Sequence, residues 1–270
     1  MTPDIGCPEQ NGQMKQPRVE LADGVVARYF PCSGGHSTGR PTIVLVHGLI
    51  VSSRYMMRLA RSLSSDFDVY ALDLPGFGHS SKPRAHLDTT QLGRTVVSSI
   101  ASLGTGPALV VANSYGCAVA TEAAKVDPSV MSGLVLIGPT VDESTTGLVE
   151  VALRFIRALP REPLWALGTT IIDALQCGPR RGLFTAHKMA QYRIGHHIGG
   201  VDLPVLLMRG EYDRVAPAEW LDRLALIART RGTVTIPGAA HMANAGQPRR
   251  TAELIATWVS EELIPETPHG

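Results

Sequence analysis

A serine between a short apolar run and a run of small residues is the first candidate for chemistry. Residues 109–111 are apolar and predict a buried strand, whereas residues 116–120 are small and predict the start of a helix. Ser114 lies between them, and a tight strand-to-helix turn at this point needs small neighbours such as Ala112 and Gly116. The pattern predicts that Ser114 is a nucleophile, while a plain helix N-cap serine remains the alternative.

Two further residues supply what a nucleophilic serine needs, namely a base and an anion that holds the base in the right tautomer. His241 lies in a Gly/Ala-rich loop after a predicted strand, and we expect it to be the base. Asp213 follows another predicted strand, in a turn that ends at Pro217, and we expect it to be the anion. The chain order Ser114, Asp213, His241 is typical of one fold among the unrelated folds that carry these side chains.

The elements that must position these residues alternate between apolar strands and helices. Strands are predicted at residues 19–21, 25–30, 42–46, 69–72, 107–111, 133–137, 204–208 and 233–236, and helices at 54–63, 89–103, 218–228 and 249–263. An Asp-Gly turn between the first two strands predicts a hairpin. The alternation predicts a mostly parallel sheet covered on both faces, with ligands bound at the carboxyl ends of its strands.

Residues 140–202 break this alternation because they carry no strong strand signal. Apolar residues recur at helical spacing from 148 to 159 and from 164 to 175, which predicts two or more amphipathic helices. We therefore expect a flexible leader at residues 1–17, a core at 18–139 and 203–264, and a helical cap at 140–202. The apolar helix faces of this cap are also compatible with a homodimer contact.

The composition limits the class of protein. The 270 residues are 44% hydrophobic and 18% charged, which suffices for a sizeable core. A net charge of +1 gives no electrostatic reason to expect nucleic acid or an anionic membrane as a partner. No run approaches the roughly 20 apolar residues of a membrane span, and no Cys-x-x-Cys pair is present. Residues 1–17 are polar and have no apolar h-region, so we do not expect them to be a signal peptide. We expect a cytoplasmic protein with reduced thiols.

With these motifs in order, the chain resembles the α/β-hydrolase superfamily from about residue 19 to residue 262. The resemblance rests on His47-Gly48, the Asp-Leu-Pro-Gly-Phe-Gly-His-Ser turn at 73–80, the turn around Ser114, the segment 210–217 and the segment 238–241. It implies an α/β fold with a mostly parallel eight-stranded sheet and a helical cap after the sixth strand. It also implies an oxyanion hole formed by the backbone N–H groups of Leu49 and Tyr115, whose side chains are free to shape the pocket. No cofactor or metal is implied.

Other residues near these motifs have competing interpretations. In the family pattern His47 and His79 order the loops around the site, and Asp73 anchors the turn that follows it. Asp142 and Glu143 follow the sixth strand and are the alternative to Asp213 as the acid.

Residues in and around the predicted cap, and one cysteine, are less informative. Cys117 is expected to be a small packed side chain rather than a redox group. His187, His196 and His197 indicate a metal site only weakly. Tyr192 and Trp165 either line the pocket or pack the cap on the core.

The function expected from these features is hydrolysis of a small or medium apolar ester, lactone or thioester through an acyl-enzyme on Ser114. The alternatives are a C–C bond hydrolase, a perhydrolase-like side activity, or a lyase or cyclase that uses the same residues. Residues 49–53 lack the Ser-Gly-Pro-Gly run usual in C–C hydrolases of this type, which disfavours that alternative. A ligand-binding protein without catalysis is the least favoured.

Overall fold

Continuous apolar runs form the centre of an eight-stranded sheet, because side chains there are buried on both faces. The computed structural model describes residues 16–34, 39–140, 147–228, 230 and 233–264. Its strands are β1 (Arg18–Glu20), β2 (Val26–Phe30), β3 (Ile43–Val46), β4 (Val69–Asp73), β5 (Ala108–Asn113), β6 (Met131–Ile137), β7 (Val205–Gly210) and β8 (Thr233–Ile236).

The strand order is β1-β2-β4-β3-β5-β6-β7-β8. Strand β2 is antiparallel to β1 and to β4, and every other pair is parallel. The predicted mostly parallel sheet and the hairpin between β1 and β2 are therefore confirmed. In such a sheet the carboxyl ends of the parallel strands meet along one edge, where the predicted site residues follow them.

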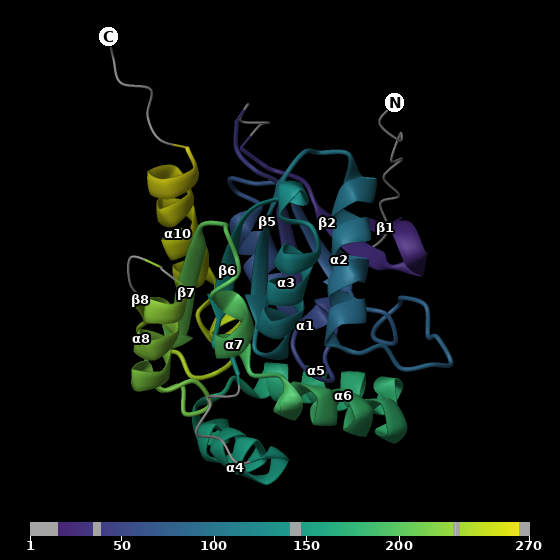
Figure 1. Cartoon of the computed structure of the whole chain (residues 1–270), viewed down its shortest axis with the longest axis vertical. Coiled ribbons are helices and arrows are strands. Elements are labelled where there is room, and N and C mark those ends of the chain that lie inside the picture. Colours follow the sequence, from purple (N-terminus) through teal and green to yellow (C-terminus); the bar gives the residue numbers. More distant parts are fainter. Residues whose placement is uncertain (1–15, 35–38, 141–146, 229, 231–232, 265–270) are drawn as a thin grey trace.

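Helices cover both faces of the sheet (Figure 1). One face carries α1 (Ser53–Leu63) and α10 (Pro248–Trp258), and the other carries α2 (Thr89–Leu103), α3 (Tyr115–Val126) and α8 (Ala218–Ile227). Successive residues of β3 point to opposite faces, so that Ile43 and Leu45 pack with α1 while Val44 and Val46 pack with α2 and α3. The short elements outside the β6–β7 connection are η1 (Ala22–Gly24), η2 (Pro128–Val130), α9 (Ala243–Gly246) and η4 (Val259–Leu263).

The connection between β6 and β7 holds a group of helices, most of which lie beyond one end of the sheet (Figure 1). We term these elements, from Leu148 to Ile198, the helical insertion. They are α4 (Leu148–Ala158), η3 (Leu159–Arg161), α5 (Leu164–Cys177), α6 (Pro179–Gln191) and α7 (Ile194–Ile198). The insertion falls within the predicted cap, whose boundaries as a separate unit remain a prediction. Residues 141–146, and residues 1–15 of the predicted leader, lie outside the described residues.

Polar side chains attach the helical insertion to the core. Asp173 of α5 accepts a hydrogen bond from Ser52 Oγ at 2.7 Å and pairs with Arg54 at 3.3 Å. Arg181 of α6 donates to the carbonyl of Pro83 at 3.0 Å. Because Asp173 is almost fully buried, this contact fixes the position of α5 over the loop that follows β3. Among the described residues, no helix combines the length and the apolar character that a membrane crossing requires.

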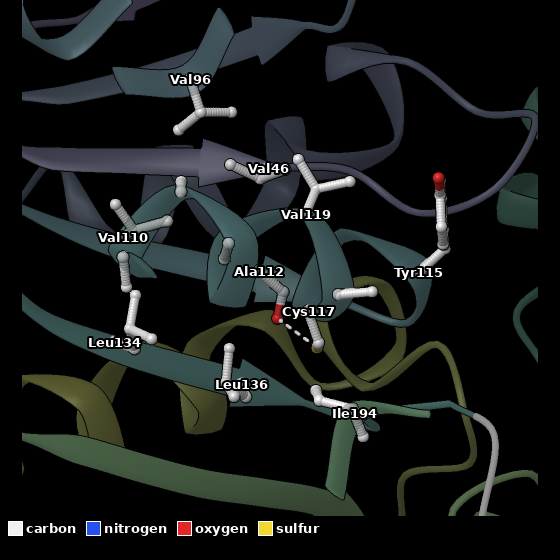
Figure 2. Close-up of a cluster of buried hydrophobic side chains, with 14 of the residues drawn as sticks. Val46, Val96, Val110, Ala112, Tyr115, Cys117, Val119, Leu134, Leu136 and Ile194 are labelled. Atoms are coloured by element: carbon white, nitrogen blue, oxygen red, sulfur yellow. Dashed lines mark hydrogen bonds between the residues drawn. The ribbon is translucent and has the colours of Figure 1, made fainter. Parts of the chain in front are cut away.

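Helix α3 lies close to the sheet because its first turns carry small side chains. Figure 2 shows Ala112, Cys117, Val119 and Leu136 in the buried cluster around this helix. The Cys117 thiol lies 3.5 Å from the carbonyl oxygen of Ala112 and 3.6 Å from that of Ile137. Burial raises the pKa of this thiol, so it stays protonated and unreactive. Cys117 is thus a packed side chain, as predicted.

Candidate active site

The turn between β5 and α3 places Ser114 in a strained backbone conformation. Its φ of 57° and ψ of −125° lie outside the regions that non-glycine residues ordinarily adopt. The surrounding sheet holds this conformation, since the Ser114 N–H donates to the carbonyl of Ile137 at 2.9 Å. The strain raises the hydroxyl into a cavity, where it is part of the wall. Ser114 thus lies at the predicted strand-to-helix turn at the carboxyl end of β5, where it is half-buried.

Gly116 makes this turn possible because it leaves room for the neighbouring strand. A Cβ atom at Gly116 would lie 2.6 Å from the carbonyl oxygens of both Val46 and His47. We expect Gly116→Ala to lower the free energy of unfolding by about 2 kcal/mol or more, because the contact is with backbone and α3 must move away from β3. Gly168→Ala is the matched control: a Cβ there meets nothing within 4 Å, so helix propensity should stabilise the protein by up to about 1 kcal/mol.

Chemical denaturation of the two glycine variants measures this difference. A Gly116→Ala protein with wild-type stability would show that the close approach of α3 to β3 is not required.

His241 and Asp213 extend from separate loops to form a chain of hydrogen bonds with Ser114. His241 follows β8, and its Nε2 lies 3.0 Å from Ser114 Oγ. Its Nδ1 lies 2.9 Å from Oδ2 of Asp213, which follows β7. A carboxylate only accepts hydrogen bonds, so Nδ1 carries the proton and Nε2 is free to accept from the serine hydroxyl. The other carboxylate oxygen, Oδ1, accepts from the N–H groups of Val215 and Ala216 at 2.8 and 2.9 Å.

The electrostatics of this chain favour a charged imidazole despite its burial. Burial alone would lower the pKa of His241, but the charge and hydrogen bond of Asp213 raise it, and the nearby Glu162 adds to that effect. The net result is a pKa above the ordinary value of 6.5. A histidine in this setting accepts a proton readily and holds it as an imidazolium.

The loop after β3 and the first turn of α3 each carry a backbone N–H group beside Ser114. His47 is fully buried; its Nε2 accepts from the Leu74 N–H at 3.0 Å, so its Nδ1 donates to the Gly48 carbonyl at 2.9 Å. This contact orients the peptide group that also contains the Leu49 N–H. Within the described residues, the N–H groups of Leu49 and Tyr115 donate to no protein acceptor. Both therefore remain available to a ligand, and Gly48 lies against Ser114.

A cavity of about 380 Å³ opens onto Ser114 and His241. Its walls come from the loop after β3, from the helical insertion and from the other core loops that carry the site residues, and they are almost entirely apolar. The described residues that line it are Gly48, Leu49, Ile50, Val51, Tyr55, Asn113, Ser114, Thr140, Val151, Ala152, Phe155, Thr170, Ala186, Met189, Val215, His241 and Met242. The volume lies at the small end of the range for ligand pockets, about 300–1,000 Å³.

A family model described as the alpha/beta hydrolase family matches residues 43–254. The chain belongs to this family. The resemblance that the motifs predicted, and with it the fold class, is therefore confirmed.

Relatives of this α/β hydrolase are also hydrolases. A 2-(acetamidomethylene)succinate hydrolase of Mesorhizobium japonicum is 25% identical over 244 residues, 81% of this chain and 88% of that protein. A pimeloyl-[acyl-carrier protein] methyl ester esterase of Stenotrophomonas maltophilia is 36% identical, but over 104 residues, 38% of each chain. The structure of a thermophilic esterase from Thermogutta terrifontis has a TM-score of 0.69 at 21% identity, over 92% of this chain and 98% of that one.

The remaining motif residues of this α/β hydrolase stabilise the turns around the site. The Asp73 carboxylate accepts from the N–H groups of Ser53 at 2.7 Å and His79 at 2.8 Å. Gly78 has a φ of +50°, and a Cβ there would lie 2.2 Å from the Asp73 carboxyl carbon. His79 itself is exposed and does not line the cavity. These contacts are the loop-ordering roles predicted for Asp73 and His47, whereas His79 takes part through its backbone N–H.

Several aromatic and histidine side chains pack rather than line the cavity. The Tyr115 side chain is buried in the core and its hydroxyl lies 3.0 Å from that of Thr89, so the expectation that it shapes the pocket is wrong. Of the two proposed oxyanion residues, only Leu49 lines the cavity with its side chain. Trp165 lies under the Arg58 guanidinium, which packs α5 on α1.

The histidines of the helical insertion do not converge on one another. His197 stacks on Tyr192 with ring centroids 4.3 Å apart, and both contact Glu122 of α3. His187 and His196 are exposed. In the part of the chain that the structure describes, no three histidine, cysteine or acidic side chains are grouped closely enough to hold a metal ion.

Three residues at the site were not predicted from the sequence. Gly138, directly after β6, has a φ of +58°, and a Cβ there would lie 2.9 Å from Asp213 Oδ2 and 3.1 Å from His241 Nδ1. Its place at a strand end is the signal that identifies it. Phe155 of α4 contacts His241 edge-on at 6.2 Å between ring centroids, and Glu162 lies close by. No sequence pattern marks these two, because they reach the site only through the fold of the helical insertion.

Proposed function

We propose that this α/β hydrolase is a serine hydrolase that cleaves a small or medium apolar carboxylic ester, lactone or thioester. The observation that carries the proposal is the unbroken hydrogen-bonded chain from Ser114 Oγ through His241 to Asp213, at 3.0 and 2.9 Å, beside an apolar cavity. The family membership and the ester-hydrolysing relatives support the same class of reaction.

The proposed reaction proceeds through an acyl-enzyme. Ser114 Oγ attacks the carbonyl carbon while His241 Nε2 takes the hydroxyl proton, and Asp213 stabilises the imidazolium that forms. His241 then returns the proton to the leaving alcohol or thiol. Water enters and attacks the acyl carbon while His241 takes a proton from it, and His241 then returns that proton to Ser114 Oγ as the bond to the acyl group breaks and the acid leaves.

The N–H groups of Leu49 and Tyr115 are the proposed oxyanion donors. Both are backbone groups that no described acceptor occupies, and the His47 side chain orients one of the two peptides. Loss of one such donor typically raises the barrier by about 3–4 kcal/mol. The proposed mechanism uses no metal or cofactor, because protein groups supply the base, the anion and the donors.

The acyl group that enters the cavity is proposed to be uncharged. The described lining contains no lysine or arginine, whereas the substrate named for the Mesorhizobium relative carries two carboxylates. We expect kcat/KM to favour p-nitrophenyl pentanoate over the equally long p-nitrophenyl hemiglutarate by at least about 100-fold, since burial of an unpaired carboxylate costs several kcal/mol. Equal rates for the two esters would contradict the uncharged-substrate proposal.

The raised pKa of His241 predicts the pH dependence. Only the neutral imidazole accepts the Ser114 proton, and a raised pKa keeps the imidazolium populated to higher pH. We therefore expect kcat/KM to increase with pH and to reach half of its plateau above pH 6.5, the ordinary value for histidine. A pH series with a neutral ester measures this midpoint, and a midpoint below 6.5 would contradict the assignment.

Two measurements together test the reaction class. A fluorophosphonate probe should modify Ser114, which mass spectrometry of the peptide verifies, and a panel of esters, lactones and thioesters should give the free acid as product. Labelling without acid release would favour a lyase or cyclase, and absence of labelling would exclude a reactive serine.

A further inference from the structure

A buried carboxylate of the helical insertion contacts the loop that carries His241. Glu162 lies between η3 and α5, and only 6% of the residue is exposed. Its two carboxylate oxygens accept from the Met242 N–H at 3.2 and 3.1 Å. Met242 directly follows His241 and lines the cavity. The insertion therefore holds the backbone of the histidine loop as well as covering the site.

The charge of this carboxylate has no ordinary partner. The described residues give Glu162 no ion pair with lysine or arginine. The titratable groups that face it are His241 and Asp213 from the core loops and Tyr55 from α1. Burial raises the pKa of Glu162, although the Met242 N–H and a protonated His241 oppose the rise. A buried carboxylate is stabilised by a nearby cation. The proposed reaction creates such a cation, because His241 becomes an imidazolium when it takes the Ser114 proton.

We propose that Glu162 is a positioning residue that fixes the His241–Met242 segment and stabilises the imidazolium formed while Ser114 is acylated. This inference rests on the proposed serine hydrolase mechanism. Asp213 fixes the imidazole through its Nδ1, and Glu162 adds a second negative charge from the side of the insertion. The helical insertion thus contributes to the stabilisation of the imidazolium as well as to the walls of the cavity.

If Glu162 only held the Met242 backbone, its charge would not matter. Variants that change the charge and the length of the side chain separately distinguish this structural role from the proposed one. Glu162→Gln keeps an oxygen that accepts from Met242 but removes the charge, whereas Glu162→Asp keeps the charge on a shorter side chain. Asp173→Asn is the matched control: Asp173 is also a buried carboxylate of the insertion and it contacts Ser52 and Arg54, but it does not line the cavity.

The first readout is the titration of the His241 ring C–H signals by NMR, assigned with a His241→Gln variant. We expect the Glu162→Gln midpoint to move to lower pH, the Glu162→Asp midpoint to stay nearer to the wild-type value, and the Asp173→Asn midpoint to remain in place. Because it needs no substrate, this readout remains valid if the reaction is not ester hydrolysis.

The second readout is the pH profile of ester turnover and of fluorophosphonate labelling. We expect Glu162→Gln to shift the acidic limb to lower pH and to lower kcat on the order of tenfold, with KM little changed, since the charge acts on the imidazolium rather than on bound ester. Asp173→Asn should lower the melting temperature and leave the shape of the profile unchanged.

The outcomes are distinguishable. An unchanged His241 midpoint and an unchanged profile in Glu162→Gln would overturn the role of Glu162 while leaving the hydrolase proposal intact. Should Glu162→Gln not fold, Glu162→Ala takes its place: a lowered His241 midpoint in Glu162→Ala that Glu162→Asp restores toward the wild-type value would support the inference, and an unchanged midpoint in Glu162→Ala would overturn it. Wild-type protein that neither labels nor releases acid would instead overturn the proposed function, whatever the titration shows.

Discussion

Replacing Ser114 with alanine is expected to lower kcat for a neutral p-nitrophenyl ester on the order of 10⁵-fold. The substitution removes the only oxygen within hydrogen-bonding distance of His241 Nε2 among the described side chains, so no covalent intermediate forms. The turn itself should persist, because alanine is no larger than serine and the Ser114 N–H bond to Ile137 is a backbone contact.

Stability is the control for this variant. We expect the melting temperature to change by no more than a few degrees, since the Ser114 hydroxyl makes one hydrogen bond to the described side chains, and the loss of one such bond lowers the free energy of unfolding little. Fluorophosphonate labelling should disappear with turnover. Turnover that survives at the wild-type rate, in a protein freed of contaminating esterase, would show that another residue is the nucleophile.

Replacing Asp213 with asparagine is expected to lower kcat about 10⁴-fold through the tautomer of His241. Oδ1 of Asp213 accepts from two backbone N–H groups, so the amide oxygen of asparagine must take that place. The NH₂ group then faces His241 Nδ1 and donates to it. The ring proton moves to Nε2, which can no longer accept from Ser114.

The alternative acids give the matched controls for the Asp213 variant. Asp142→Asn and Glu143→Gln remove the charges that the sequence also offered after β6, at positions outside the described residues. We expect both to retain turnover within a few-fold of wild type. A large loss in either of them, together with a mild effect of Asp213→Asn, would transfer the acid role. Steady-state kinetics on all three variants with one ester decides between these assignments.

The core of this site was predictable because strand ends are visible in the sequence. Ser114, Asp213 and His241 each follow an apolar run, and parallel strands bring such positions to one edge of a sheet. The structure places the three within hydrogen-bonding distance of one another along the predicted chain. Their catalytic roles remain a proposal, and their selection among the other polar residues that follow strands, such as His47 and Asp73, rested on the family resemblance.

The contribution of the helical insertion was not predictable in the same way. Helical periodicity identified α4 and α5, but it does not determine how two amphipathic helices cross or which residue at their junction points inward. Glu162 reads in the sequence as one more charged residue beside Arg161. For Tyr115, the sequence predicted the position of the residue but not the direction of its side chain. That direction depends on packing in the core, where the Tyr115 hydroxyl contacts Thr89.

The adjacency of β6 and β7 has a consequence for how such an enzyme acquires new specificity. The two strands are hydrogen-bonded parallel neighbours, so the chain leaves the sheet at the carboxyl end of β6 and re-enters it in the next strand, at the amino end of β7. One contiguous segment could therefore be exchanged for a segment from a relative without altering the order of any strand. Such a graft would retain Ser114, His241 and Asp213 while replacing the part of the cavity wall that the insertion supplies. The graft would also replace Glu162, the residue proposed to stabilise the His241 imidazolium. A chimaera would therefore acquire the selectivity of the donor protein and also part of its reactivity.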